Sequence, residues 1–254
     1  KVRAGRPMRH ALITGASRGI GEAIARALAA DEWALTLTGR TAPTALADEL
    51  GALAVAMDQT DPASIQTAFD QARARFGPLT ALINNAGAVE TAPFTRTTPE
   101  LWQRMLAVNL TGPMLCCHAA VPDLKAAGHS GRIVNIASTA ALKGYAYVSA
   151  YVAAKHGLLG LTRTLALELA AQGSTVNAVC PGYTETDIVR DGIAKVVAKT
   201  GRSEAEARAG FTQGNPQGRL VQPAEVAATV RWLCSPEAGA VNGQAIAVCG
   251  GETM

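Results

Sequence analysis

The stretch HALITGASRGIG, residues 10–21, decides the fold of this chain. Its first five residues form a short apolar run typical of a buried strand, and a glycine-rich turn follows. After the turn, Ile20, Ile24, Ala27 and Leu28 recur at the three- and four-residue intervals of a helix with one apolar face. Such a turn suits a phosphate, because glycines let the backbone approach closely and the helix start offers free N–H groups. Its G-x-x-x-G-x-G spacing differs from G-x-G-x-x-G, so alone it also fits an ordinary tight connection.

Strand-like and helix-like segments alternate along the rest of the chain. Apolar runs predict six further strands, at residues 33–38, 52–57, 79–84, 131–138, 174–180 and 244–248. Helical patterns lie between them, at residues 43–50, 61–76, 99–127 and 151–171. Strands this apolar are buried on both faces, as in a parallel sheet covered by helices. We therefore predict an α/β fold, a doubly wound Rossmann-type domain with a seven-stranded, mostly parallel sheet and helices on both faces.

No repeat, low-complexity run or linker divides the 254 residues, so we predict one dinucleotide-binding and catalytic domain over residues 1–254. Residues 1–9 are basic and precede the first strand, with no apolar signal-peptide core after them, so we expect a flexible leader. Residues 186–219 interrupt the alternation with a glycine-containing helical segment. Such long insertions are usually functional, which predicts a lid over the substrate; an ordinary surface helix pair is the alternative.

The composition excludes several classes of protein. Hydrophobic residues make up 48% and charged residues 17%, which indicates a globular protein rather than a disordered one. A net charge of +3 without a run of basic residues argues against nucleic-acid binding. The sequence contains no uninterrupted run of 18 apolar residues, so no membrane span is predicted. The five cysteines form no C-x-x-C pair and the four histidines have no ligand spacing. We expect reduced thiols in a cytoplasmic protein, and no metal site.

Polar motifs follow the predicted strands in a fixed order. Tyr151 and Lys155 lie four residues apart, hence on one face of a helix, and an ammonium near a phenol lowers the phenol's pKa. A tyrosine tuned in this way is suited to general acid/base catalysis. The hydroxyl of Ser138 is suited to hold a carbonyl oxygen. Each motif alone also fits packing or a solvated pair. The set comprises Asn84-Asn85-Ala86-Gly87, Asn109, Ser138, Tyr151-x-x-x-Lys155 and Pro181-Gly182.

Together with the glycine-rich turn, these motifs resemble the short-chain dehydrogenase/reductase family from residue 10 to residue 251. The resemblance implies that Asn109, Ser138, Tyr151 and Lys155 are catalytic. It implies that Asn109 holds a water in a proton relay to Lys155, although from the residues alone a satisfied buried amide is the plainer interpretation. It also implies that residues 84–87 support the cofactor's adenosine side and the central sheet. The implied cofactor-binding residues are Gly15, Ser17, Arg18, Gly19, Ile20, Gly21, Arg40, Asp58, Asn85, Ala86, Gly87, Tyr151, Lys155, Pro181, Gly182, Thr184 and Thr186.

The end of the second predicted strand indicates which cofactor is preferred. In dinucleotide-binding folds a carboxylate at this place binds the ribose 2′-hydroxyl of NAD. Here the sequence is Thr38-Gly39-Arg40, so a glycine takes that place and an arginine follows. Arg18 in the glycine-rich turn approaches from the other side, and arginine suits phosphate. We predict NADP(H) rather than NAD(H); two solvated arginines are the alternative.

Longer segments resemble bacterial ketoreductases that act on 3-oxoacyl thioesters of acyl carrier protein or coenzyme A. These segments are GRIVNIAST, AKHGLLGLTR, VNAVCPG, GRLVQPAEVA and AVCGG. Ala88-Val89-Glu90 replaces the Pro-Gly-Gly of the aromatic polyketide branch. The resemblance implies an NADPH-dependent carbonyl reductase. A secondary-alcohol or hydroxyacyl-CoA dehydrogenase is the alternative, and a non-catalytic cofactor-binding protein is a remote one.

The resemblance also implies a homotetramer or dimer, paired through the helices at 99–127 and 151–171. Leu158, Leu161, Leu165 and Leu169 would form part of that face, unless they pack only on their own sheet.

Overall fold

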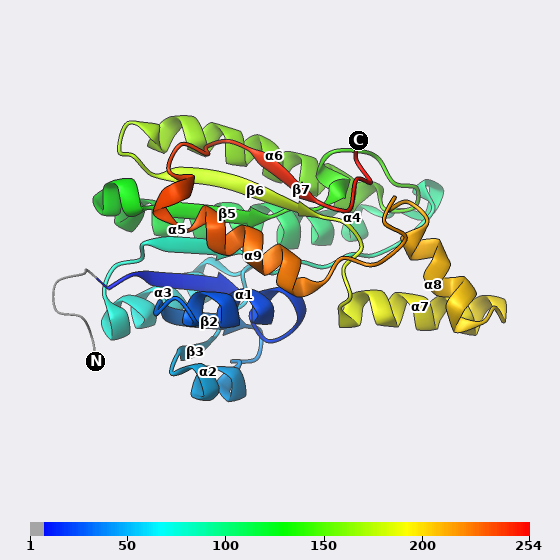
Figure 1. The fold of residues 1–254 in the computed structure, drawn as a ribbon, viewed down its shortest axis with the longest axis horizontal. Helices are drawn as coiled ribbons and strands as arrows, with labels where there is room; N and C mark the ends of the chain where they lie inside the picture. Colours follow the sequence, from blue (N-terminus) through cyan, green and yellow to red (C-terminus); the bar gives the residue numbers. More distant parts are fainter. Residues whose placement is uncertain (1–7) are drawn as a thin grey trace.

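The computed structural model describes residues 8–254, so most of the leader expected over residues 1–9 lies outside the described part of the chain. Seven strands form one sheet in the order β3-β2-β1-β4-β5-β6-β7, and every neighbouring pair is parallel (Figure 1). The predicted doubly wound α/β fold is thereby confirmed. The strands are β1 (His10–Thr14), β2 (Ala34–Gly39), β3 (Leu53–Ala56), β4 (Ala81–Asn84), β5 (Arg132–Ile136), β6 (Thr175–Pro181) and β7 (Ala245–Val248).

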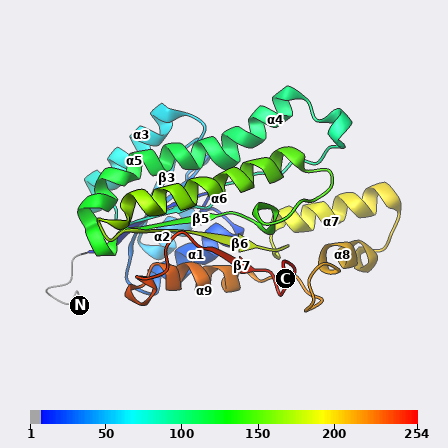
Figure 2. The same cartoon turned by 90° about the horizontal axis from the view of Figure 1, so that it is seen from above.

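Helices cover both faces of the sheet (Figure 2). On one face lie α1 (Gly19–Ala29), α2 (Thr44–Leu50) and α9 (Pro223–Leu233). On the other lie α3 (Pro62–Phe76), α4 (Pro99–Leu106), α5 (Gly112–Ala127) and α6 (Ser149–Ala170). Two further helices, α7 (Asp187–Thr200) and α8 (Glu204–Thr212), form the segment after β6 and extend beyond the carboxyl ends of the strands (Figure 1).

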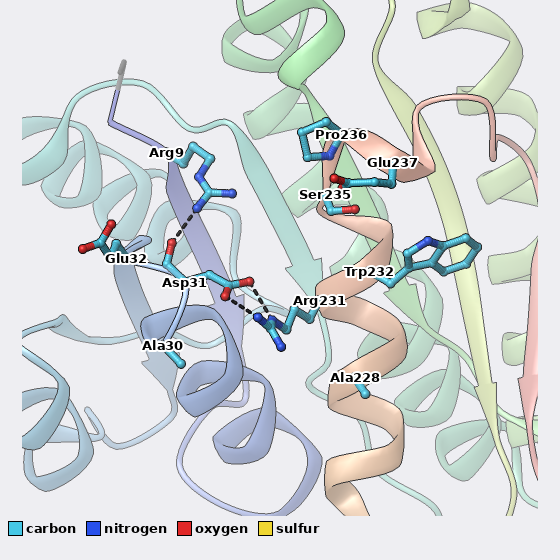
Figure 3. A pocket seen from close by; sticks show the side chains of 10 residues that line it. All are labelled: Arg9, Ala30, Asp31, Glu32, Ala228, Arg231, Trp232, Ser235, Pro236 and Glu237. Carbon is cyan, nitrogen blue, oxygen red and sulfur yellow. Dashed lines mark hydrogen bonds and ion pairs between the residues drawn. The ribbon is translucent and has the colours of Figure 1, made fainter. Parts of the chain in front are cut away.

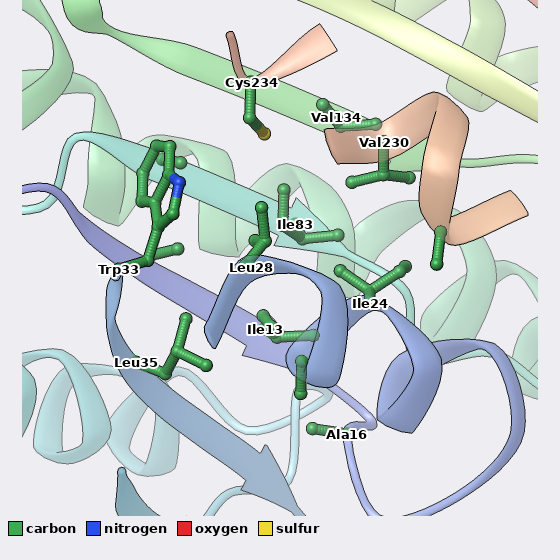
Figure 4. Packing of buried hydrophobic residues seen from close by; sticks show 14 of the residues in the cluster. Ile13, Ala16, Ile24, Leu28, Trp33, Leu35, Ile83, Val134, Val230 and Cys234 are labelled. Atoms are coloured by element: carbon green, nitrogen blue, oxygen red, sulfur yellow. The ribbon is translucent and has the colours of Figure 1, made fainter. Parts of the chain in front are cut away.

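The packing of α1 and α9 on the sheet holds the glycine-rich turn in place (Figure 4). Ile13 and Ile83 project from neighbouring strands and are fully buried, as are Ile24 of α1 and Val230 of α9. Full burial of one such side chain stabilises the fold by about 1.5–3 kcal/mol. The start of α1 is therefore fixed against the carboxyl end of β1. Between β1 and β4 the order of the strands in the sheet changes direction. Ligands of doubly wound folds bind at the carboxyl ends of the strands at such a point.

Two helices differ from the predictions. The helical run predicted over residues 99–127 is present, but at its centre Ala107–Thr111 form a π-helical turn between α4 and α5. In an α-helix the carbonyl of Asn109 would accept a bond from residue 113, but Pro113 has no N–H. Helix α9 was not predicted, although Pro223 at its first position and the reciprocal bonds of Gln222 and Glu225 mark its start.

Within residues 8–254, the helical run Pro99–Ser130 is long and apolar enough, by length and composition, to cross a membrane. Its most apolar window has a mean hydropathy of 1.3, although it contains no uninterrupted apolar run of 18 residues. In the fold this run packs on the sheet and against α3 and α6, which is the position of a covering helix in an α/β protein.

Candidate active site

The glycine-rich turn is held by the residues that follow β4. The Thr14 hydroxyl accepts hydrogen bonds from the backbone N–H groups of Asn85 and Ala86, both at 3.0 Å. The Asn85 amide donates to the carbonyls of Thr14 (3.0 Å) and Gly15 (2.9 Å). Gly15 has a left-handed φ of 64°, and a Cβ there would lie 2.8 Å from Cα of Ala86. A side chain at position 15 would therefore separate the two loops.

The start of α1 is open towards the carboxyl edge of the sheet. Arg18 is the N-cap residue and its side chain makes no capping hydrogen bond, so the first N–H groups of α1 face outward from the helix. Ser17 and Arg18 are exposed, whereas Ile20 packs against the core. A Cβ on Gly21 would lie 2.3 Å from the carbonyl oxygen of Gly15, so the turn and the helix are in close contact. Free N–H groups at the positive end of a helix fit a pyrophosphate.

The edge of the site next to β2 and β3 contains arginines and carboxylates. Arg40 is exposed just after β2, and its charge helps to hold the pKa of Asp58 below its usual value; two hydrogen bonds from Thr60 to that carboxylate contribute more. Arg18 lies 3.7 Å from the Asp187 carboxylate at the start of α7. At the end of β2 and in the glycine-rich turn the sequence predicted two arginines without an acid, and it separately placed Asp58 among the cofactor-binding residues. The acids come instead from the end of β3 and from the segment after β6, which the sequence of β2 does not report.

Three of the predicted catalytic side chains meet where β5 and α6 come together. Ser138 follows β5, and Tyr151 and Lys155 lie on the first turns of α6. The Lys155 Nζ is 5.7 Å from the centre of the Tyr151 ring and donates a 2.8 Å hydrogen bond to the carbonyl of Ile136. The phenol of Tyr151 is hydrogen-bonded to the Ser138 hydroxyl. A proton donor, a hydroxyl and an ammonium are thus brought to one place.

Burial dominates the titration of this group. It raises the pKa of Tyr151 above its usual value, and the hydrogen bond with Ser138 opposes that shift only in part. Burial also lowers the pKa of Lys155 to about 8. The prediction that Lys155 lowers the pKa of Tyr151 is therefore not met in this structure. Removing both groups from water disfavours phenolate and ammonium alike.

Asn109 has the contacts of a satisfied buried amide. Its Nδ2 donates to the carbonyls of Ala88 (2.9 Å) and Met105 (3.0 Å), and its Oδ1 accepts from the N–H of Ala88 at 3.3 Å. The side chain is nevertheless close to Lys155. A Cβ built on Gly87 would lie 3.0 Å from the Asn109 Oδ1 and 3.7 Å from the Lys155 Nζ. Only the space of one methyl group at Gly87 separates the two side chains.

Sequence reasoning missed a chain of buried polar residues under the site. The Asn84 amide donates to the Asn135 side chain of β5 at 2.8 Å, and Asn135 donates to the Thr162 hydroxyl of α6 at 2.9 Å. All three are buried and join β4, β5 and α6. Thr14 was missed too. The signal for Thr14 and Asn135 was a polar residue inside an apolar strand, which costs free energy unless it is hydrogen-bonded.

The predicted residues after β6 lead directly from the sheet to the segment over residues 186–219. Pro181 ends β6, and Gly182 accepts a 2.9 Å bond from the Thr184 hydroxyl. Thr186 then reaches the glycine-rich turn: a Cβ on Gly19 would lie 3.1 Å from its methyl group. With the Arg18–Asp187 pair, this contact joins the start of α7 to the glycine-rich turn.

A separate cleft of about 650 Å³ lies at the opposite, amino end of the strands (Figure 3). Its walls come from the turn after α1 and from the end of α9, and Arg231 bridges them by bonds of 2.6 and 2.5 Å to the Asp31 carboxylate. None of the predicted site residues lines it. Ligands of doubly wound folds bind at the carboxyl ends of the strands, so this cleft is not the active site.

Comparisons with known proteins agree with this geometry. A family model described as "Enoyl-(Acyl carrier protein) reductase" matches residues 15–253. D-beta-hydroxybutyrate dehydrogenase of Rhizobium meliloti is 36% identical over 96% of this chain and 98% of its own length. The 3-oxoacyl-[acyl-carrier-protein] reductase FabG of Escherichia coli is 37% identical over 96% and 97%. A crystal structure of a point variant of actinorhodin polyketide ketoreductase with NADPH matches with a TM-score of 0.91 and 36% identity, over 97% of each chain. The chain therefore belongs to the short-chain dehydrogenase/reductase family and is an oxidoreductase acting on CH–OH and C=O groups.

Proposed function

We propose that this protein is an NADPH-dependent carbonyl reductase whose physiological substrate is a 3-oxoacyl thioester of acyl carrier protein or coenzyme A. The observation that carries the proposal is the Tyr151 phenol, which is hydrogen-bonded to Ser138 and lies one helical turn from Lys155. Because burial raises its pKa, this phenol keeps its proton at neutral pH. A protonated phenol is the form that reduction of a ketone requires.

The roles of the residues follow from their positions. A nicotinamide cofactor bound at the glycine-rich turn would supply a hydride to the carbonyl carbon. Ser138 holds the carbonyl oxygen, and Tyr151 donates its proton to that oxygen as negative charge develops there. Lys155 stabilises the resulting phenolate and holds the nicotinamide ribose. Asn109 lies near Lys155, with Gly87 between them. It supports a water-mediated transfer of a proton back to Tyr151.

NADPH is proposed as the cofactor because the side chains of Arg18 and Arg40 are both available to bind a 2′-phosphate. The Arg18–Asp187 pair is exposed and long, and such pairs contribute little to stability. Arg40 is exposed and follows a glycine, so no side chain on the last residue of β2 occupies the place of the 2′-phosphate. The glycine-rich turn fits the pyrophosphate. The remaining predicted residues, from Asn85 to Gly87 and from Pro181 to Thr186, would line the cofactor between these two ends.

The thioester substrate is supported by the names of relatives, one of which is a 3-oxoacyl-[acyl-carrier-protein] reductase. We propose that α7 and α8 form a lid. Their small core of Val189, Ile193, Ala207 and Leu220 is separate from the cores that hold the sheet, so the pair can move as a unit. We place the enzyme in the cytoplasm, in agreement with five buried, unpaired cysteines.

A steady-state screen tests the proposal. Acetoacetyl-CoA, cyclic ketones and quinones are offered to the enzyme with NADPH and, separately, with NADH. We expect reduction of at least one of these carbonyl compounds, with a higher kcat/KM for NADPH than for NADH. A higher kcat/KM in the oxidative direction, with a 3-hydroxyacyl-CoA at neutral pH, would favour the dehydrogenase alternative, which the relative named a hydroxybutyrate dehydrogenase supports. Cofactor binding without turnover of any compound would favour the non-catalytic alternative.

We further propose a homotetramer or dimer paired through α5 and α6. Met114 and Leu167 project from these helices with exposed fractions of 39% and 81%. Leu158 and Leu169 do not contribute as the sequence predicted, because they are buried within the chain; Leu161 and Leu165 are only partly buried. Sedimentation at micromolar protein concentration tests this, and a monomer alone would refute it.

A further inference from the structure

Glu252, in the turn after β7, is a buried carboxylate on the substrate side of the site. Its side chain is 4% exposed. The Tyr145 hydroxyl donates a hydrogen bond to its Oε1, and the Lys143 Nζ lies 3.2 Å from the same oxygen. Lys143 also donates to the backbone carbonyl of Glu252 at 3.1 Å. A carboxylate this deeply buried requires such partners, because an unpaired charge in the interior is strongly unfavourable.

The carboxylate lies between three segments that border the site. Lys143 and Tyr145 belong to the loop between Ser138 and Tyr151. A Cβ on Gly182, in the turn after β6, would lie 3.0 Å from the Glu252 Oε2, and one on Gly214, after α8, would lie 3.5 Å from Oε1. The two glycines leave the space that the carboxylate fills. Glu252 is thus in contact with the catalytic loop and with both ends of the α7–α8 segment.

Tyr145, which Glu252 holds, begins a row of aromatic rings. Its ring packs edge-to-face on Tyr183, with centres 6.4 Å apart, and Tyr183 packs in the same manner on Phe211 of α8 at 5.1 Å. The hydroxyl of Tyr145 also bonds the Thr139 hydroxyl at 2.6 Å, next to Ser138. Tyr183, the middle ring, is near enough to Tyr151 to contribute to the raised pKa of that phenol, so the row passes beside Tyr151 and ends on α8.

We propose that Glu252 is a positioning residue, which fixes Tyr145 so that Tyr145, Tyr183 and Phe211 form one wall of the substrate pocket. This wall selects ketones with a ring next to the carbonyl. Edge-to-face packing on aromatic side chains binds a flat aromatic ring more tightly than a linear chain. Lys143 is neutralised by Glu252 and adds no free charge to the wall. The inference rests on the proposed carbonyl reduction and narrows its substrate class to acyl groups or ketones that contain a ring.

Two variants test this role. Glu252→Gln keeps the size of the side chain and removes its charge, and Tyr145→Phe keeps the ring and removes the hydrogen bond. For α-tetralone, a bicyclic ketone, each variant should raise KM about tenfold and change kcat less than about twofold, as expected for loss of one hydrogen bond to a charged group. KM for acetoacetyl-CoA should change less than KM for α-tetralone. Glu49→Gln is the control, since this exposed carboxylate binds Arg26 far from the site.

Hydrogen exchange supplies a readout that does not need turnover. In Glu252→Gln, peptides covering residues 139–147 and 182–186 should exchange faster than in the wild type, and Glu49→Gln should leave them unchanged. Equal losses for both ketones, or unchanged exchange and KM, would overturn the inference. If the wild-type enzyme reduces neither ketone, the proposed function fails, while the exchange experiment still decides whether Glu252 holds the loop.

Discussion

The carboxyl edge of the sheet is built in two ways. At β1 and β4, the glycine-rich turn and the Asn85-Ala86-Gly87 loop are held by bonds to backbone groups, and a methyl group on Gly15 or Gly21 would collide with backbone or amide atoms. At β5 and β6 the site consists of buried ionisable side chains, among them Lys155 and Glu252, and of tyrosines. The first region depends on shape, whereas the second depends on charge and on proton affinity.

This difference separates stability from catalysis. A side chain added at the β1–β4 edge meets closely packed atoms, so the fold itself is affected. A functional group removed at the β5–β6 edge leaves the packing almost unchanged, because phenylalanine or glutamine has nearly the same shape as the native residue. Substitutions at the two edges should therefore move different measurements.

The largest effect is expected from Tyr151→Phe. It removes the proton donor and keeps the ring, so kcat should fall by about 10²–10⁴. The melting temperature and the Kd for NADPH, measured by calorimetry, should change little. A variant that retains more than half of the wild-type kcat would show that another group is the acid.

Gly21→Ala should destabilise the protein at the β1–β4 edge of the sheet. Its Cβ would lie 2.3 Å from the Gly15 carbonyl oxygen and 2.5 Å from the Asn85 Nδ2, so the turn must shift. We expect the free energy of unfolding to fall by about 3 kcal/mol, the upper range for overpacking. Gly210→Ala is the matched control: no atom lies within 4 Å of its Cβ position in α8, so it should stabilise by about 0.5–1 kcal/mol. Equal urea midpoints for the two variants would contradict the shape-based account of this edge.

Gly39→Asp tests charge at the β1–β4 edge. A carboxylate at the end of β2 should repel a 2′-phosphate and bind a ribose hydroxyl, so the ratio of kcat/KM for NADPH to that for NADH should fall by at least about tenfold. Position 39 is also tight, because a Cβ there would lie 2.9 Å from the Thr41 carbonyl oxygen. Gly39→Ala therefore measures the steric part, which should lower both values alike. A wild-type enzyme that prefers NADH would refute the cofactor assignment.

The last prediction concerns the pH dependence of reduction, where the change is smallest close to neutral pH. Burial lowers the pKa of Lys155 to about 8, so the ammonium is present below pH 8 and is lost as the pH rises through that value. Because the ammonium stabilises the phenolate left by proton donation, kcat for reduction should be constant below pH 8 and fall by up to about tenfold per unit above it. Melting temperatures over the same range distinguish this loss from unfolding. A kcat that stays constant to pH 10 would show that the lysine charge is not required.

The sequence predicted the features that depend on neighbouring residues or on backbone conformation, such as strands, helices and glycine turns. Residues 10–21 contain strand, turn and helix in one stretch, and this pattern predicted both the sheet and the place of the glycine-rich turn. Contacts between distant residues left no such pattern. Tyr145 and Glu252 are 107 positions apart, and Asn84 and Asn135 are 51 apart. The pKa of Tyr151 depends on burial, which only the complete fold determines.

The π-helical turn at Ala107–Thr111 sets how far α4 is rotated about the helix axis relative to α5. That rotation depends on the number of residues in the turn. There the N–H of Gly112 bonds the carbonyl of Ala107, five residues back. Deleting one residue from this turn would alter no ionisable group, yet it would rotate α4 by about 100° relative to α5. The link between Asn109 and Ala88 would then be lost, although each flanking helix kept its own sequence. In this part of the chain, the count of residues carries structural information that no single side chain carries.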